Sequence, residues 1–241
     1  MRGILICLLL WVGGAAHAAT CVDILFKGVS YTTCEVMSDE DLRLFQAGPD
    51  GPYGSFSAIK SALEPQGLTL NFAMNGGMFH RDLAPVGLYV EGGSQKNPLI
   101  TSDGPGNFGL LPNGVFCVGD RFLVVESRSF RAAPPACRFA NQSGPMLVID
   151  GALHPKFLPG SDSLNIRNGV GVSDDGLRAI FVISNAEVNF YTFAQMFRDY
   201  LGTPNALYFD GSISRLYAPQ LDRHDGGFPM GPIVGVVVPR G

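Results

Sequence analysis

Beyond its first nineteen residues, the sequence lacks any apolar stretch long enough to cross a membrane, because Gly, Pro and charged residues interrupt each one. A spanning helix needs about 20 apolar residues, so no membrane span is expected. The chain also lacks a basic cluster, and its formal net charge is -4. These features argue against nucleic acid as a partner. The absence of repeats, linkers and low-complexity blocks favours a single domain.

Several motifs of metal binding and catalysis are missing as well. No CxxC or His-x-His spacing occurs, so neither a metal ion nor another cofactor is expected. No G-x-S-x-G nucleophile elbow occurs, and Ser143 precedes Gly144-Pro145 rather than a helix. This pattern argues against a hydrolase of the serine-triad type.

The N-terminus has the pattern of an export signal. Arg2 precedes an apolar run from Ile4 to Val12, and Ala16-His17-Ala18 matches the small-residue pattern at a signal-peptidase site. We therefore predict a signal peptide over residues 1–19 and a single folded domain over residues 20–241. The expected location is periplasmic or secreted.

Four cysteines follow the predicted signal, and an even number in an oxidising compartment favours two disulfides. A lipid anchor on Cys21 is the alternative for the first of them. If Lys27-Gly28 is a two-residue hairpin turn, Cys21 lies opposite Cys34 at a non-hydrogen-bonded position, where side chains approach most closely. This register predicts Cys21–Cys34, and Cys117–Cys137 follows by elimination.

Turn signals and apolar periodicity predict an α+β fold of mixed, largely antiparallel β-sheets with about two helices. The 31 Gly and 17 Pro residues favour many turns. One helix is expected over Ser55–Leu63, and a second begins at the capping-box pair Thr192 and Gln195 and ends before Gly202. Strands are expected over Val22–Phe26, Tyr31–Val36, Asp41–Phe45, Leu68–Met74, Ala206–Phe209 and Ile233–Val238, with hairpin turns at 112–114, 119–120, 150–151 and 174–176.

Polar residues gather after or before several of these strands. The strand that ends at Met74 runs into Asn75-Gly76-Gly77, where glycines allow close backbone approach and successive amides can bind an anion. A plain turn is the alternative interpretation. Asn141-Gln142-Ser143 stands just before the apolar run that starts at Met146, which places polar donors at the end of a sheet.

Two charged residues also stand at strand ends. Arg167 has no acidic residue nearby in sequence, so it either faces solvent or binds a carboxylate or phosphate. Asp210 ends a strongly apolar strand, a position that suits an active-site acid. Asp210-Gly211 also matches an ordinary turn, and that interpretation stays open.

Taken together, four segments resemble the spaced motif set of the phosphodiester glycosidase family, and more closely a short exported bacterial branch of it. They are Met74–Phe79, Gln142–Leu147, Arg167–Val172 and Tyr208–Ser214. The resemblance covers roughly residues 65–238. The family often has an Asp-Gly-Gly-Gly-Ser turn where this chain has Asp210-Gly211-Ser212-Ile213-Ser214, so the sugar that it recognises stays open.

The resemblance implies an exported hydrolase of a sugar-1-phosphodiester, of the GlcNAc-1-phosphodiester type, with a glycan or sugar phosphate as substrate. A protein that binds such a glycan without turnover is the alternative, and an export-stage interaction protein is a third hypothesis. Such chemistry needs a cation for the phosphate and a carboxylate near the anomeric carbon. We assign Arg167 and the Asn75, Gly76 and Gly77 amides to the phosphate, and Asp210 to the carboxylate. Predicted sugar or phosphate contacts are His80, Gln142, Ser143 and Asn168; Glu187 is a weaker candidate acid, and Asp174 and Asp175 are assigned to a hairpin turn.

Overall fold

The chain opens with a hairpin of β1 (Thr20–Phe26) and β2 (Val29–Met37) in the computed structural model, which describes residues 18–241. Lys27 and Gly28 both have positive φ angles, 49° and 78°, as a two-residue turn of this kind requires. Cys21 therefore lies opposite Cys34, and a disulfide joins them, as predicted. Most of the predicted signal peptide lies outside the described residues.

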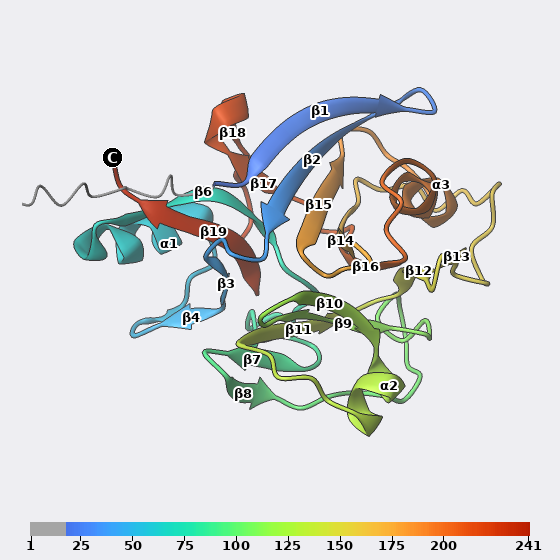
Figure 1. Ribbon diagram of the computed structural model, residues 1–241, viewed down its shortest axis with the longest axis horizontal. Coiled ribbons are helices and arrows are strands. Elements are labelled where there is room, and N and C mark those ends of the chain that lie inside the picture. The colour runs from blue at the N-terminus through green and yellow to red at the C-terminus, as the bar shows by residue number, and fades with distance from the viewer. Residues whose placement is uncertain (1–17) are drawn as a thin grey trace, which may run out of the picture.

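This hairpin forms one edge of a seven-stranded antiparallel sheet (Figure 1). The hairpins at 150–151 and 174–176 both belong to this sheet, and both confirm the predicted turns. The strands of the seven-stranded sheet follow the order β1, β2, β15 (Arg178–Ser184), β14 (Asn168–Val172), β16 (Asn205–Asp210), β12 (Met146–Ile149) and β13 (Ala152–Leu153).

Two five-stranded sheets pack against the first one. One has the order β10 (Phe122–Glu126), β9 (Gly114–Val118), β11 (Phe139–Ser143), β7 (Tyr89–Glu91) and β8 (Ser94–Asn97). The other has the order β18 (Arg223–His224), β17 (Leu216–Ala218), β6 (Leu68–Asn75), β19 (Ile233–Pro239) and β3 (Leu42–Phe45). β4 (Ala47–Gly48) and β5 (Gly51–Pro52) form a separate two-stranded ribbon.

The main core lies where the three sheets meet, and aromatic rings from each sheet fill it. Phe181 of β15 lies 5.0 Å from Phe72 of β6 and 5.7 Å from Phe116 of β9, measured between ring centroids. Phe209 of β16 lies 6.4 Å from Phe116. Because these rings are buried, they fix the relative positions of the strand ends that carry the polar residues.

The helices differ in part from expectation. α1 (Phe56–Leu63) is confirmed: Ser55 caps it by accepting from the Ala58 N–H. α3 (Phe190–Gln195) begins earlier than predicted, because Asn189 is its cap and accepts from the Thr192 N–H. The helix continues as the π-helical η2 (Met196–Tyr200) and ends before Gly202, which has a positive φ. Further helical segments are α2 (Ser127–Ala132), η1 (Glu64–Gln66) and η3 (Pro219–Leu221).

Two further local predictions are wrong. Residues 112–114 do not connect a hairpin, because an irregular loop leads into β9 there. Asn141-Gln142-Ser143 is not a loop before a strand but part of β11. The turn at 119–120 is confirmed between β9 and β10, and the Cys117–Cys137 disulfide forms as predicted.

The architecture confirms the predicted α+β class with largely antiparallel sheets. Within residues 18–241, no helix is long and apolar enough to cross a membrane.

Candidate active site

The polar residues predicted at strand ends meet where two sheets adjoin. Asn75 ends β6, Asn168 begins β14 and Asp210 ends β16. The Asn75 Nδ2 donates to the Asn168 Oδ1 at 3.1 Å, and the Asn168 Nδ2 donates to the Asn75 Oδ1 at 2.8 Å. The Asn168 Oδ1 also accepts from the Asp210 N–H at 3.1 Å. Both asparagines are fully buried, so this pair fixes the backbone at Asp210.

The third sheet reaches the same place through β11. The Ser143 Oγ donates to the Phe209 carbonyl at 3.0 Å, immediately before Asp210. The Asn141 Nδ2 donates to the Gly76 carbonyl, immediately after Asn75. Strand ends from all three sheets are thus joined by buried side-chain amides and a hydroxyl.

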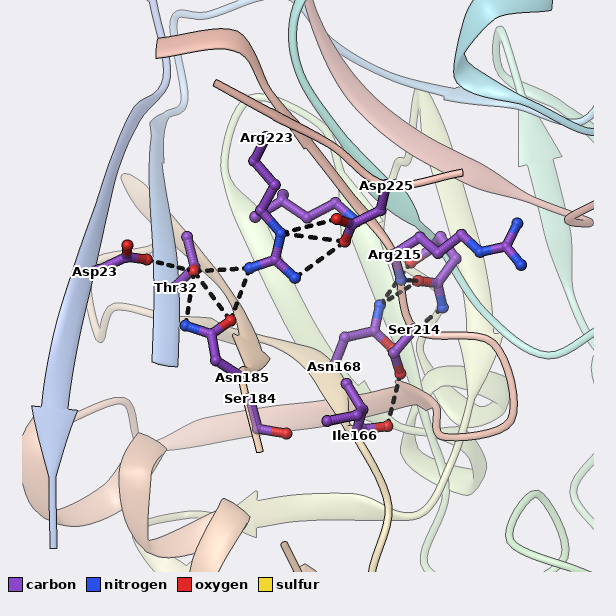
Figure 2. Close-up of polar contacts among 12 residues, drawn as sticks. Asp23, Thr32, Ile166, Asn168, Ser184, Asn185, Ser214, Arg215, Arg223 and Asp225 are labelled. Atoms are coloured by element: carbon purple, nitrogen blue, oxygen red, sulfur yellow. Dashed lines mark hydrogen bonds and ion pairs between the residues drawn. The ribbon is translucent and has the colours of Figure 1, made fainter. Parts of the chain in front are cut away.

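The loop after Asp210 is held by the same cluster. The Asn75 Oδ1 accepts from the Arg215 N–H at 2.9 Å, and the Ser214 Oγ donates to the Asp210 carbonyl at 3.0 Å. The Ser214 Oγ also donates to the Ile166 carbonyl at 2.9 Å (Figure 2). These contacts explain how a loop with few glycines keeps a defined path beside the site.

Asp210 is both a turn residue and a buried acid. Its Oδ1 accepts from the N–H groups of Gly211 and Ser212, at 2.6 and 2.8 Å, and only 9% of the residue is exposed. No Lys, Arg or His within the described chain forms an ion pair with it. Burial raises the pKa of the Asp210 carboxyl, and the N–H groups of the turn partly offset this effect. Asp210 can therefore form the Asp-Gly turn and still be a candidate active-site acid.

Arg167 neither faces solvent nor binds a carboxylate. Its guanidinium is fully buried and donates to the carbonyls of Val188 and Ser163, both at 2.8 Å, and to the Tyr208 hydroxyl at 3.2 Å. It also lies 3.7 Å from the centre of the Phe190 ring. Burial lowers its pKa, but a guanidinium remains charged at neutral pH.

Tyr208 connects this arginine with the Asp210 turn. Its hydroxyl lies so close to Gly211 that a Cβ at that position would overlap with the oxygen. Residue 211 is therefore glycine for a steric reason. Burial raises the pKa of the Tyr208 hydroxyl, so it stays protonated. Tyr208 opens the motif segment Tyr208–Ser214, but no role was predicted for its side chain, because it stands in an apolar strand.

Two of the predicted contacts lie apart from this cluster. The Gln142 Oε1 accepts from the N–H groups of Leu88 and Ile100, at 3.1 and 3.0 Å, and its Nε2 donates to the Ser127 Oγ at 2.9 Å. These bonds hold neighbouring loops. His80 is exposed and lies in a turn, where its N–H donates to the Ala84 carbonyl at 2.8 Å. The bonds of Gln142 favour a structural role for it, and the structure tests neither of the two predicted substrate contacts.

A second polar cluster lies beside the first (Figure 2). The Arg223 Nη1 donates to the Thr32 Oγ1 at 2.9 Å and to the Asn185 Oδ1 at 2.7 Å, while its Nε and Nη2 bond to Asp225. Asp225 in turn accepts from the Leu216 N–H at 2.9 Å. Because Asp225 neutralises it, Arg223 is a weaker candidate than Arg167 for binding an anion.

Neither the surface cavities nor the acidic residues indicate another centre. A cavity of about 1300 Å³ borders Asp41, Arg43 and Arg138, and none of the predicted site residues lines it. Both arginines there pair with Asp41. Within the part of the chain that the structure describes, His, Cys, Asp and Glu do not gather in groups of three or more.

Comparisons with known proteins give the family and the fold of the chain. The phosphodiester glycosidase family matches residues 69–234. The chain is 40% identical over 166 residues to the uncharacterized protein YigE of Escherichia coli K12, a match that covers 68% of this chain and 64% of that protein. The catalytic domain of zebrafish N-acetylglucosamine-1-phosphodiester alpha-N-acetylglucosaminidase, auto-inhibited by its pro-peptide, has a similar fold. Its TM-score is 0.60 at 13% identity, over 93% of this chain and 84% of that one.

The chain therefore belongs to the phosphodiester glycosidase family, as its motifs predicted.

Proposed function

We propose that this protein hydrolyses a sugar-1-phosphodiester by cleaving the bond between the anomeric carbon and a phosphodiester oxygen. The observation that carries the proposal is the buried Asp210 carboxylate, which lacks an ion-pair partner in the described chain and lies where strand ends converge. A phosphate monoester is a good leaving group, so a carboxylate near the oxocarbenium-like carbon matters more than an acid. Asp210 would stabilise that carbon or activate the attacking water.

The phosphate requires positive charge and hydrogen-bond donors. Arg167 supplies a buried charge that no carboxylate of the described chain neutralises, and three hydrogen bonds leave two of its five N–H groups without an acceptor among the described residues. The Gly76 N–H already donates to the Pro232 carbonyl at 2.7 Å, whereas the Gly77 N–H has no acceptor among the described residues. We therefore assign the phosphate to Arg167 and the Gly77 amide.

The sugar is expected to contact the polar groups that surround Asp210. Ser143 and Asn168 lie in the cluster, and Ser212 is exposed at the turn where the family often has glycine. A serine at 212 adds a side chain to the turn whose N–H groups bind the Asp210 carboxylate. GlcNAc is the first sugar to test, and other 2-substituted and unsubstituted sugars belong in the same panel.

The protein is proposed to act in the periplasm or outside the cell. Two disulfides support this location, because such bonds persist in oxidising compartments. N-terminal sequencing of exported protein should find a chain that begins near Thr20.

The decisive assay measures free sugar and phosphomonoester released from a panel of sugar-1-phosphodiesters, with the unphosphorylated glycosides as controls. We expect turnover of at least one phosphodiester and none of the controls. Binding without turnover would replace this proposal with a non-catalytic glycan-binding protein. If the protein neither binds nor hydrolyses any member of the panel, its ligand belongs to another class.

A further inference from the structure

The Gly77 N–H is a buried backbone donor in the loop that follows β6. Gly77 is buried, and its N–H has no hydrogen-bond acceptor among residues 18–241, whereas the preceding Gly76 N–H donates to the Pro232 carbonyl at 2.7 Å. Nearly all buried backbone N–H groups are paired, since an unpaired donor lowers stability. An unpaired N–H at the end of β6 therefore indicates a donor that serves a ligand.

Asn141 sets the direction of this donor. Its side chain is buried on β11, and its Nδ2 donates to the carbonyl of Gly76, which belongs to the same peptide unit as the Gly77 N–H. The C=O and N–H of a trans peptide point in opposite directions. The bond from Asn141 therefore turns the Gly77 N–H away from β11.

The same contact explains why residue 77 is glycine. A Cβ at Gly77 would overlap with the Asn141 Nδ2, so any larger residue would displace the amide. On its other side the loop is fixed by Met78, which packs against the buried cluster that contains Tyr208. The loop thus lies between Asn141 and this buried cluster.

We propose that Asn141 is a positioning residue that holds the Gly77 N–H as the donor to a phosphoryl oxygen of the substrate. The inference rests on the proposed function, because it assigns the phosphate of that substrate to this amide. The proposal also gives a role in phosphate binding to Asn141, a buried residue that was not among the predicted site residues. Asn141 suits this role, since among the described residues its Oδ1 has no partner and the Gly76 carbonyl is the one group that orients its amide.

The first test compares Asn141→Leu with Asn97→Leu. Leucine at 141 keeps the volume but removes the donor to Gly76, whereas Asn97 donates to the carbonyls of Pro85 and Gly87 outside the site and serves as the control. We expect KM for the phosphodiester to rise about 10–100-fold in Asn141→Leu, the usual effect of losing one hydrogen bond to a charged group, with a smaller change in kcat. A KM equal to that of the Asn97 variant would overturn the proposal.

A binding readout separates this inference from the proposed function. In NMR spectra of the wild type, methyl phosphate should shift the Gly77 amide proton, and Asn141→Leu should lose this shift while other core resonances stay in place. This result would support the inference even if no phosphodiester were hydrolysed. A Gly77 amide that does not respond to methyl phosphate in the wild type would overturn it.

A double variant distinguishes positioning from packing. Gly77→Ala should lower Tm, because its methyl group meets Asn141, and adding Asn141→Ala should restore much of that loss by making room. Binding of methyl phosphate should stay at least 10-fold weaker in the double variant, since nothing then orients the peptide. Recovery of both Tm and binding would show that Asn141 only fills space.

Discussion

Asn75 and Asn168 donate hydrogen bonds to each other's side-chain oxygens although 93 positions separate them in the sequence. The pair joins the end of β6 to the start of β14 and therefore connects two sheets. Each side-chain oxygen also accepts from a backbone N–H: the Asn168 Oδ1 from that of Asp210, and the Asn75 Oδ1 from that of Arg215. The position of the candidate acid thus depends on a contact between two neutral side chains.

A double-mutant cycle should detect this contact. Asn75→Ala and Asn168→Ala should each lower the free energy of unfolding by about 2–3 kcal/mol, because each leaves a buried N–H without an acceptor. The double variant should lose less unfolding free energy than the sum of the two single losses. In urea denaturation the coupling should be about 1–2 kcal/mol. The control pairs Asn168→Ala with Asn205→Ala at the other end of β16, where additive effects are expected. Additivity in the first pair would contradict the geometry.

Gln142 should prove a structural residue. Gln142→Leu removes the acceptor for the Leu88 and Ile100 N–H groups, and we expect a loss of roughly 2–4 kcal/mol in unfolding free energy. At a temperature where the variant is folded, its KM should equal that of the wild type. Gln220→Leu is the control, since Gln220 makes a single bond to the Ala19 carbonyl and should cost under about 1 kcal/mol. A raised KM with unchanged stability would restore Gln142 to the substrate site.

Stability should fall in mild acid because of His154. This side chain is buried against Phe157, and burial lowers its pKa from 6.5 to about 4. The unfolded chain then binds a proton at a higher pH than the native state does. Stability is therefore lost as the pH falls from about 6.5 to about 4, by up to roughly 3 kcal/mol. Urea denaturation should show this slope in the wild type, and a His154→Gln variant should lack it. An equal slope in both proteins would assign the effect to other groups.

Local rules explain why some elements could be predicted. The Cys21–Cys34 bridge follows from a two-residue turn and the alternation of a strand, and both are properties of neighbouring residues. The start of α3 could not be chosen in the same way, because Asn189 and Thr192 are both good capping residues. The structure uses the Asn189 side chain, and Thr192 supplies the N–H that it caps.

The site was harder to predict because its partners are distant in sequence. In a strand, successive side chains alternate between the two faces. A strand over Asn141-Gln142-Ser143 therefore places Asn141 and Ser143 on one face and Gln142 on the other. No such rule exists for Arg167. Its partners Val188 and Tyr208 lie 21 and 41 positions away, so only the packed fold shows that they surround it.

Arg167→Lys should affect both folding and binding. A lysine ammonium lacks the planar fork and cannot reach the carbonyls of Val188 and Ser163 together with the Tyr208 hydroxyl. We expect a loss of about 2–4 kcal/mol in unfolding free energy, and KM for the phosphodiester should rise more than kcat falls. The exposed Arg131, which donates to Thr101, gives the control variant Arg131→Lys. Unchanged KM in a folded Arg167→Lys protein would remove Arg167 from phosphate binding.

Asp210→Asn should separate catalysis from stability. The amide is nearly isosteric, and its Oδ1 can still accept from the Gly211 and Ser212 N–H groups, so the turn should remain. Turnover should fall by about 10²–10⁴, the usual cost of removing a general base, while substrate binding persists. Asp120→Asn, in the turn between β9 and β10, is the matched control and should keep full activity. Full activity of Asp210→Asn would transfer the carboxylate role to Glu187, since Asp174 lies in the hairpin turn at the opposite end of β14.

The stability of the same variant gives an independent check on the burial of the charge. Because burial raises the pKa of Asp210, the native state holds its proton more tightly than the unfolded chain does, and the wild type loses stability as the pH rises through the usual aspartate range near 3.8. An asparagine at 210 carries no charge, so the variant does not lose stability in this way as the pH rises. Asp210→Asn should therefore be more stable than the wild type at pH 7, and the difference should shrink as the pH falls toward 3. A variant that is less stable at pH 7 would mean that the carboxylate is stabilised in the native state by contacts stronger than the turn N–H groups.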